Sequence, residues 1–153
     1  MGFDDSILND LRGTVEKLQK AINGSMKESI EKNRRSVIKL QTTDQMYQGK
    51  TNEGVDIKPF YAESTIKIKR KKGQIIGRVT LKDTGDFYRG IEIIAGNNVV
   101  IIIAGSSPSY GGIYLVDKYE DILGLTQENW SIFILRFTLP TIKKNFDDII
   151  AKS

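Results

Sequence analysis

The stretch VTLKDTGDFY, residues 79–88, decides the fold that the sequence predicts, together with the two apolar runs that follow it. Within this stretch, the apolar residues Val79 and Leu81 alternate with polar ones, which is typical of a half-buried strand. We therefore expect a strand over residues 79–82, followed by a break at the DTG triplet. The rest of the chain is expected to form helices and loops around this β unit.

A sharp turn is predicted where the strand ends. Asp83 or Thr84 can cap a helical turn, and Gly85 supplies the backbone freedom that a corner needs. Phe87 and Tyr88 then bring two aromatic rings next to the corner. We interpret these residues as structural, with the two rings docking the turn onto the helices.

The next two apolar runs predict a β-hairpin. The runs IEII (91–94) and VVIIIAG (99–105) flank the turn AGNN (95–98), and apolar runs joined by a Gly-Asn turn are a strong hairpin signal. The predicted fold class is α+β. It consists of a small antiparallel sheet with this central hairpin, packed by N-terminal helices and a long C-terminal helix.

Two amphipathic helices are predicted before residue 41. The first spans residues 4–22, and its apolar positions recur at three- and four-residue steps. They are Ile7, Leu8, Leu11, Val15, Leu18 and Ile22. The helix is expected to end at Asn23-Gly24, although Gly24 is also tolerated inside a longer helix. Ser25 and Glu28 form a capping box for a second helix. We assign the apolar faces of both helices to core packing.

The C-terminal helix is predicted to begin at Thr126, a good capping residue. Its buried stripe is expected to contain Trp130, Phe133, Ile134 and Phe137. After Pro140 the apolar phase resumes one residue out of step, so the proline is expected to kink the helix or to start a new segment. Its final turns belong either to the core or to a contact with a neighbouring subunit.

Four other segments connect these elements. Residues 48–58 and 104–112 are rich in glycine and polar residues, which predicts surface loops. Residues 117–125 are expected to form a helical turn closed by Gly124. Over residues 64–73 the signals conflict, because Ile66 and Ile68 alternate with lysines as in a strand, whereas Ser64 can cap a helix.

The composition excludes several kinds of chemistry. The chain of 153 residues has no Cys and no His, which rules out disulfides, Cys or His zinc sites, thiol nucleophiles and Ser-His catalysis. Its apolar runs are too short to cross a bilayer, and its N-terminus is acidic where a signal peptide would be basic. The close pair Asp83 and Asp86 is interpreted as capping or solvated carboxylates. We expect one domain, 1–153, with no enzyme activity, cofactor, metal or membrane partner.

Positive charge is concentrated in one segment. Residues 61–82 contain seven Lys or Arg and one Glu, a formal charge of +6, whereas the whole chain carries +4, so the remainder carries −2. Such a block suggests an acidic partner. The candidate DNA-facing or inter-subunit residues are Lys67, Lys69, Arg70, Lys71, Lys72 and Arg78. The same residues are also compatible with a solvated face or with an ion-paired subunit contact.

Three stretches carry a resemblance to a known family: KRKKGQ (69–74), RVTLKDTGDFYRGI (78–91) and YLVDKYEDILGLTQENW (114–130). Their combination resembles structural proteins of tailed bacteriophages and prophages of the Bacteroidetes, including the crAss-like phages. The core Leu81-Lys82-Asp83-Thr84-Gly85 is similar to the L-x-D-T-G signature of tail-completion, neck and virion-morphogenesis proteins. The resemblance spans about residue 41 to the C-terminus.

The resemblance implies a small virion protein that forms a homo-oligomeric ring. The ring would lie at the head–tail junction or along the tail barrel, with six- or twelve-fold symmetry, around or lining the DNA channel. Its neighbours would be portal, neck or tail proteins, and it would be found in the virion, and in the host cytoplasm during assembly. The family-motif residues would form a structural turn: Leu81, Asp83, Thr84, Gly85, Phe87 and Tyr88.

A second function stays open from the sequence, namely a non-enzymatic nucleic-acid-binding module that uses the basic segment 67–78. The pI of about 9.2 and the aromatics beside the basic segment favour this alternative. No helix-turn-helix, zinc-finger or RNA-recognition pattern supports it. Binding that vanishes at moderate salt, in a protein that stays monomeric, would be its expected signature.

Overall fold

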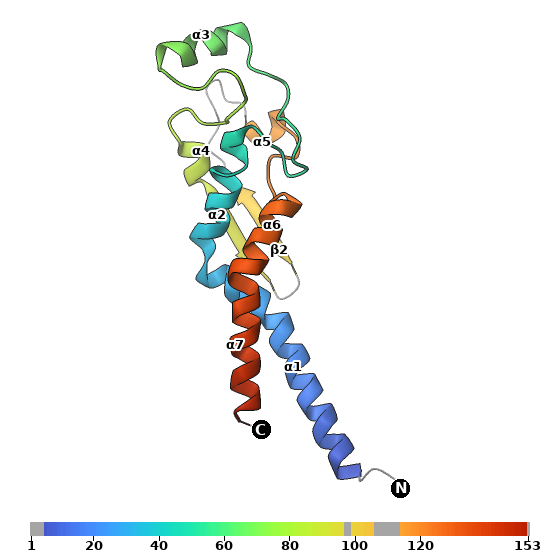
Figure 1. Ribbon diagram of the computed structural model, residues 1–153. Helices are drawn as coiled ribbons and strands as arrows, with labels where there is room; N and C mark the ends of the chain where they lie inside the picture. Colours follow the sequence, from blue (N-terminus) through green and yellow to red (C-terminus); the bar gives the residue numbers. More distant parts are fainter. Residues whose placement is uncertain (1–4, 97–98, 106–113, 153) are drawn as a thin grey trace.

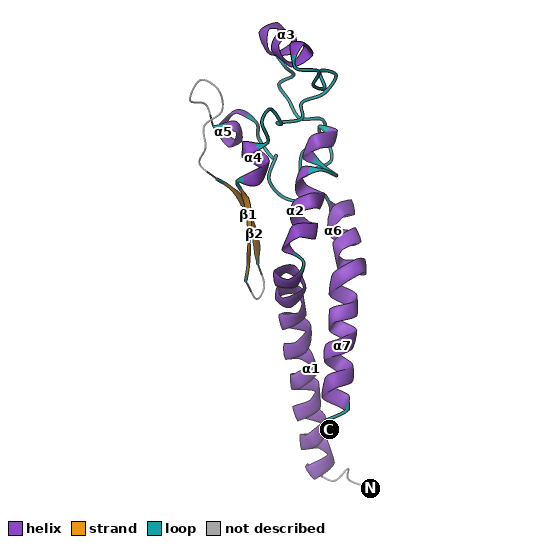
Figure 2. Cartoon of the chain, turned by 90° about the vertical axis from the view of Figure 1, so that its left-hand side faces the viewer, coloured by secondary structure: helices purple, strands orange, loops and turns teal. Residues whose placement is uncertain are grey.

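The computed structural model describes residues 5–96, 99–105 and 114–152, and it has the predicted α+β fold. An antiparallel two-stranded sheet packs on helices from both ends of the chain (Figure 1). The molecule is elongated, with helix α3 at one end and both chain termini at the other (Figures 1 and 2).

The N-terminal helix is longer than the glycine signal predicted. Helix α1 covers Asp5–Lys32 without a break at Gly24, and α2 covers Arg34–Thr42. Gly24 is therefore tolerated inside the helix. The capping-box prediction is wrong, because the Ser25 hydroxyl donates to the carbonyl of Ala21 one turn earlier. The helix breaks at Asn33, whose φ of −120° and ψ of 30° are not helical.

The C-terminal helical rod consists of α6 (Gln127–Phe133), the π-helix η2 (Ile134–Thr138) and α7 (Leu139–Ile150). Thr126 caps it as predicted, and its hydroxyl accepts from the amide of Asn129 at 3.2 Å. The π-helix lies immediately before Pro140 and takes up the one-residue shift of the apolar phase, because a π-turn holds one residue more than an α-turn. Pro140 lies in the first turn of α7, so of the two predicted alternatives the start of a new helical segment is the one observed.

The predicted hairpin is confirmed. Strand β1 (Ile91–Ala95) pairs antiparallel with β2 (Val100–Ala104), with Ile93 opposite Ile102. The inward-facing side chains of β1 are buried, whereas the outward-facing ones, Ile94 among them, are exposed.

The strand predicted over residues 79–82 does not form. Leu81 has a φ of 52°, in the left-handed region, which interrupts an extended chain. Two tyrosine hydroxyls occupy the main-chain groups of Thr80: its amide donates to Tyr61 at 2.8 Å, and its carbonyl accepts from Tyr88. These groups are the ones that a sheet ladder would use, so Thr80 is held by side chains instead.

The other short elements correct several boundaries. They are η1 (Met46–Gln48), α3 (Glu63–Lys71), α4 (Asp86–Arg89) and α5 (Leu115–Lys118). The helical alternative for residues 64–73 is right, but α3 begins after Ala62 and Ser64 is not its cap. The helical turn predicted over residues 117–125 is displaced to α5. After α5 the chain follows an irregular path, with φ of 54° at Asp121 and 110° at Gly124.

Of the two predicted loops, only one can be compared. Residues 48–58 are largely exposed as expected, but the side chains of Thr51 and Ile57 are buried and anchor the loop. Most of the loop predicted over residues 104–112 lies outside the described residues.

The buried apolar side chains form two clusters that meet at the hairpin. The first contains Met46, Ile57, Val79, Leu81, Ile91, Tyr119 and Ile122. The second contains Ile30, Val37, Leu40, Ile93, Leu125 and Phe133. Ile102 of β2 packs against both clusters, so the hairpin connects the first cluster to the second.

The prediction that α1 packs into the core holds only for its C-terminal half. There, Ser29 bonds Thr138 at 3.0 Å, and Asn145 of α7 bonds Ser25 at 3.1 Å, which sets the two helices antiparallel. The N-terminal half of α1 runs on past the end of α7 (Figure 2). The apolar residues of that half remain exposed, except for Leu18, which is half-buried.

Candidate functional site

The predicted basic segment lies on and after α3, at the end of the molecule far from the termini (Figure 1). Its residues do not share one environment. Lys69 is only 6% exposed, and its Nζ donates to the carbonyl of Lys82 at 2.7 Å and to Gln74 Oε1 at 3.0 Å. The same ammonium lies 5.0 Å from the ring centroid of Tyr61. Lys69 is therefore part of the internal structure.

Lys72 is also engaged, through an ion pair with Asp83 of the DTG turn. Its Nζ lies 2.8 and 2.9 Å from the two carboxylate oxygens, and Gln74 Nε2 donates to the same carboxylate at 3.0 Å. We call Lys69, Lys72, Gln74, Lys82 and Asp83 the clasp, because they tie the end of α3 to the DTG turn. The hydrogen bond from Lys72, followed by that from Gln74, holds the pKa of Asp83 below its ordinary value.

Arg78 is also engaged within the fold, through contacts with Tyr47. Its Nε donates to the Tyr47 carbonyl at 2.8 Å, and its guanidinium lies 5.6 Å from the ring centroid. The ammonium of Lys82 lies 5.2 Å from the same ring. Two cations of the predicted segment thus stack on one tyrosine.

Three of the six predicted basic residues remain available: Lys67, Arg70 and Lys71 are exposed. Within the described ranges, none of their side chains makes a hydrogen bond or an ion pair. Their spacing of three and four residues places them on one face of α3, opposite the buried Lys69. We call these three residues the basic face.

The DTG turn forms a corner where one was predicted, but neither Asp83 nor Thr84 caps α4: the N-cap is Gly85, without a side-chain hydrogen bond. Gly85 has a φ of 90°, and a Cβ there would come within 3.1 Å of Arg89, so glycine is required at this corner. The Thr84 hydroxyl donates to the carboxylate of Asp86, which also pairs with Arg89. These two hydrogen bonds, from Thr84 first and Arg89 second, lower the pKa of Asp86.

The two aromatic residues dock the turn onto the first core cluster rather than onto helices. Phe87 and Tyr88 are half-buried against that cluster, with their ring centroids 6.5 Å apart. Burial raises the pKa of Tyr88, whose hydroxyl donates to the Thr80 carbonyl. Leu81 lies in the cluster itself.

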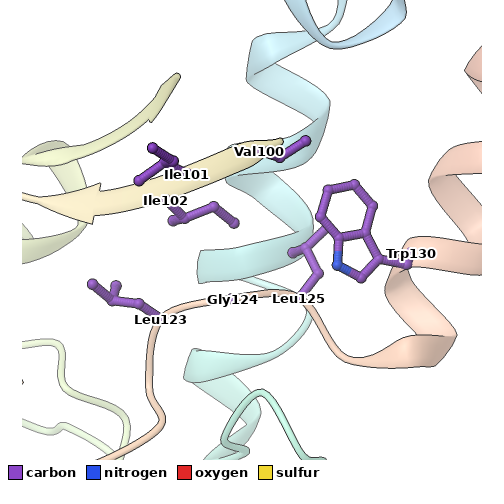
Figure 3. Close-up of a pocket in the computed structure, with 7 residues that line it drawn as sticks. All are labelled: Val100, Ile101, Ile102, Leu123, Gly124, Leu125 and Trp130. Atoms are coloured by element: carbon purple, nitrogen blue, oxygen red, sulfur yellow. The ribbon is translucent and has the colours of Figure 1, made fainter. Parts of the chain in front are cut away.

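A pocket of about 310 Å³ lies between β2 and the segment that leads into α6 (Figure 3). Trp130 and Leu125 approach it from one side, and Ile102 from the strand. All of its lining residues are apolar or glycine. Among the residues that the structure describes, no three His, Cys, Asp or Glu side chains come together in a way that could hold a metal ion.

Sequence reasoning missed a buried polar cluster made by Gln41, Gln45 and Asn129. Gln45 Nε2 donates to the Gly124 carbonyl at 2.7 Å, and its Oε1 accepts from the Thr126 amide at 2.8 Å. The burial of Gln41 could have been predicted from the sequence, because Gln41 follows the apolar Val37 by four residues and therefore lies on the same face of the helix.

Asp83→Asn is expected to cost at most about 1 kcal/mol of unfolding free energy at neutral pH, because both side chains of the ion pair are about half exposed. The pKa of Asp83 is lowered in the folded state, so its contribution is present above the ordinary carboxyl pKa and is lost as the pH falls through the lowered value. Urea unfolding of both proteins should therefore converge in acid. A difference that widens on acidification would contradict the clasp geometry.

Comparison with known proteins adds no relative: no family model, curated protein or solved structure matches this chain. Of the helices in the described part, none is long and apolar enough to span a membrane.

Proposed function

We propose that this protein is a structural virion protein of a tailed phage, whose copies close into a ring at the head–tail junction or along the tail barrel. The resemblance around the L-x-D-T-G turn supports the family. In the proposal, six or twelve copies surround the DNA channel and contact portal, neck or tail proteins. Its activity is assembly, and it has no catalytic step.

The observation that carries the proposal is an apolar stripe on α1 that the described part of the chain leaves mostly exposed. The stripe is made of Leu8, Leu11, Val15, Leu18 and Ile22. Leu18 is half-buried, and the other four are 39% to 63% exposed. A continuous stripe at helical spacing differs from scattered surface leucines, and such a stripe usually faces another helix or subunit.

A second apolar surface lies on the outer face of the hairpin. Ile94, Ile101 and Ile103 point away from the core and are 38% to 50% exposed. In the described chain, each strand pairs only with the other, so both outer edges also keep free main-chain groups. Strand β2 is thus apolar on both faces, as in a strand that is covered on both sides.

The two surfaces differ, which favours head-to-tail contact between copies. When one patch of a molecule binds a different patch of the next copy, the assembly grows as a ring or a helix rather than stopping at a two-fold dimer. We propose that the α1 stripe of one copy packs on the outer hairpin face of its neighbour, by the helix-on-apolar-surface mode.

Paired charges in the stripe should abolish this assembly. In Leu11→Glu with Val15→Glu, the purified protein is expected to stay monomeric at concentrations at which the native chain forms rings, because two carboxylates would have to be buried at the contact. Sedimentation velocity and negative-stain electron microscopy measure the difference. Since both side chains are already exposed, the helical circular dichroism should not change.

The matched control places the same charges, at the same spacing, on the opposite face of α1, as Asn9→Glu with Gly13→Glu. Nothing lies within 4 Å of a Cβ at Gly13, so this variant should fold and assemble normally. A native protein that remains monomeric at every concentration, and that is absent from purified particles, would refute the ring. Equal loss of assembly in both variants would refute the role of the stripe.

A further inference from the structure

We infer that the basic face of α3 binds the phosphate backbone of a nucleic acid without reading its sequence. Its three cations, Lys67, Arg70 and Lys71, are exposed. The helix that carries them, α3, lies at the tip of the elongated molecule (Figure 2). None of them is used within the described part of the fold. A convex helix that carries several unpaired cations on one face suits phosphate contact, which depends on charge and not on base identity.

Acidic side chains around this end do not neutralise the basic face. Asp83 is paired with Lys72, Asp86 with Arg89, and Asp56 with Lys50 at 2.8 Å. Within α3 the only carboxylate is Glu63, in its first turn. These three aspartates are therefore paired with cations that do not belong to the basic face.

The charge distribution favours a nucleic acid over a second copy of the chain. Outside residues 61–82 the chain carries a formal charge of only −2, so another copy presents little net negative charge to the basic face. A phosphate backbone carries one negative charge per nucleotide and matches a row of cations.

The shape of α3 argues against a lipid surface as the partner. Helices that lie on membranes need a broad apolar face beside their cations. On α3 the large apolar side chain that is mostly exposed is Ile68, and it lies to one side of the basic face. The basic face itself consists of the three cations Lys67, Arg70 and Lys71.

The contact is assigned to phosphates and not to stacked bases. Helix α3 contains no aromatic residue, and Tyr47 is already covered by Arg78 and Lys82. The exposed Phe60, which precedes α3, has the ammonium of Lys58 5.9 Å from its ring centroid. Phe60 is the aromatic that would stack on a base if the assignment were wrong.

This inference goes beyond the ring and does not require it, since the basic face and the α1 stripe lie at opposite ends of the molecule (Figure 1). A single copy can use both surfaces at once. Failure of DNA binding would leave assembly untouched, and failure of assembly would leave binding by the monomer measurable.

The test is fluorescence anisotropy of a labelled double-stranded DNA of mixed sequence, titrated with the full chain at several salt concentrations. Three phosphate contacts predict a slope of log affinity on log salt of about −2.7, which is about a 40-fold fall between about 50 and 200 mM. Replacing all three residues of the basic face by glutamine should remove this component. Replacing its two lysines by arginine, which retains the charge, should preserve it.

The control removes the same charge at the other end of the molecule, by glutamine at three exposed lysines: Lys143, Lys144 and Lys152. This variant should bind like the native protein. Equal weakening in both triple variants, a salt-independent affinity, or tighter binding to anionic vesicles than to DNA would overturn the inference. So would a larger loss of binding from Phe60→Ala than from the basic-face variant, because it would assign the contact to bases.

Discussion

Phe133→Ala is expected to lower the free energy of unfolding by about 3–5 kcal/mol. Phe133 is fully buried at the centre of the second core cluster, where α6 meets α2 and the hairpin. Its ring packs edge-on against Trp130 at 6.2 Å and tilted against Phe137 at 5.2 Å. Alanine would remove these contacts and leave a cavity that the surrounding helices cannot close.

Guanidinium unfolding followed by circular dichroism measures this loss. The matched control is Leu135→Ala, two residues further along the same rod, where the side chain is 64% exposed. That substitution should change stability by no more than about 0.5 kcal/mol. If Phe133→Ala cost as little as the control, the second cluster would not be the main core of the helical part.

Gln41→Leu is expected to cost about 2–5 kcal/mol, although it replaces a polar side chain by an apolar one of similar size. Gln41 is fully buried, and its Nε2 donates to the Ile122 carbonyl at 2.8 Å while its Oε1 accepts from the Gly124 amide at 2.9 Å. Leucine would leave both main-chain groups buried without partners, at about 1–3 kcal/mol each.

The same substitution at Gln48 is the control for that prediction, because this side chain is exposed and its one bond, to the Thr43 carbonyl, is 3.3 Å long. Gln48→Leu should be nearly neutral. Thermal melts of the two variants at one pH measure the difference in stability: Gln41→Leu should melt at a clearly lower temperature than Gln48→Leu. A nearly neutral Gln41→Leu would mean that water reaches the segment around Gly124 and replaces the lost bonds.

The elements that sequence reasoning placed correctly are those whose cause is local. The hairpin follows from two apolar runs on either side of a Gly-Asn turn, and the start of α6 follows from the hydroxyl of Thr126. The one-residue shift of the apolar pattern around Pro140 could also be seen in the sequence. In the structure, the π-helix η2 accounts for it. In each case the residues that decide the outcome lie within a few positions of one another.

The strand predicted over residues 79–82 was wrong because its outcome depends on a distant residue. Alternation of Val79 and Leu81 indicates burial, and both side chains are indeed buried. The main-chain groups of Thr80, however, are taken by the hydroxyls of Tyr61 and Tyr88. Tyr61 lies 19 residues earlier, so no local sequence pattern predicts its contact with Thr80.

In the basic segment, too, the outcome depends on residues that are distant in the sequence. Its formal charge of +6 can be counted from the sequence, but the charge that stays available cannot. Lys72 and Asp83 are 11 residues apart, and Arg78 and Tyr47 are 31 apart. These contacts form only when the chain folds back, and they reduce six candidate cations to the three of the basic face.

The sequence by itself determined the α+β class, the presence of the hairpin, the amphipathic character of α1 and the location of the positive charge, since each follows from residue type and short-range spacing. Only the tertiary structure decided which apolar surfaces are covered. Helix α7 runs antiparallel to α1 and ends before it does, so the stripe near Leu11 and Val15 has no partner within the described chain. Whether an apolar face becomes core or contact surface depends on the relative length and position of two helices that lie more than a hundred residues apart in the chain.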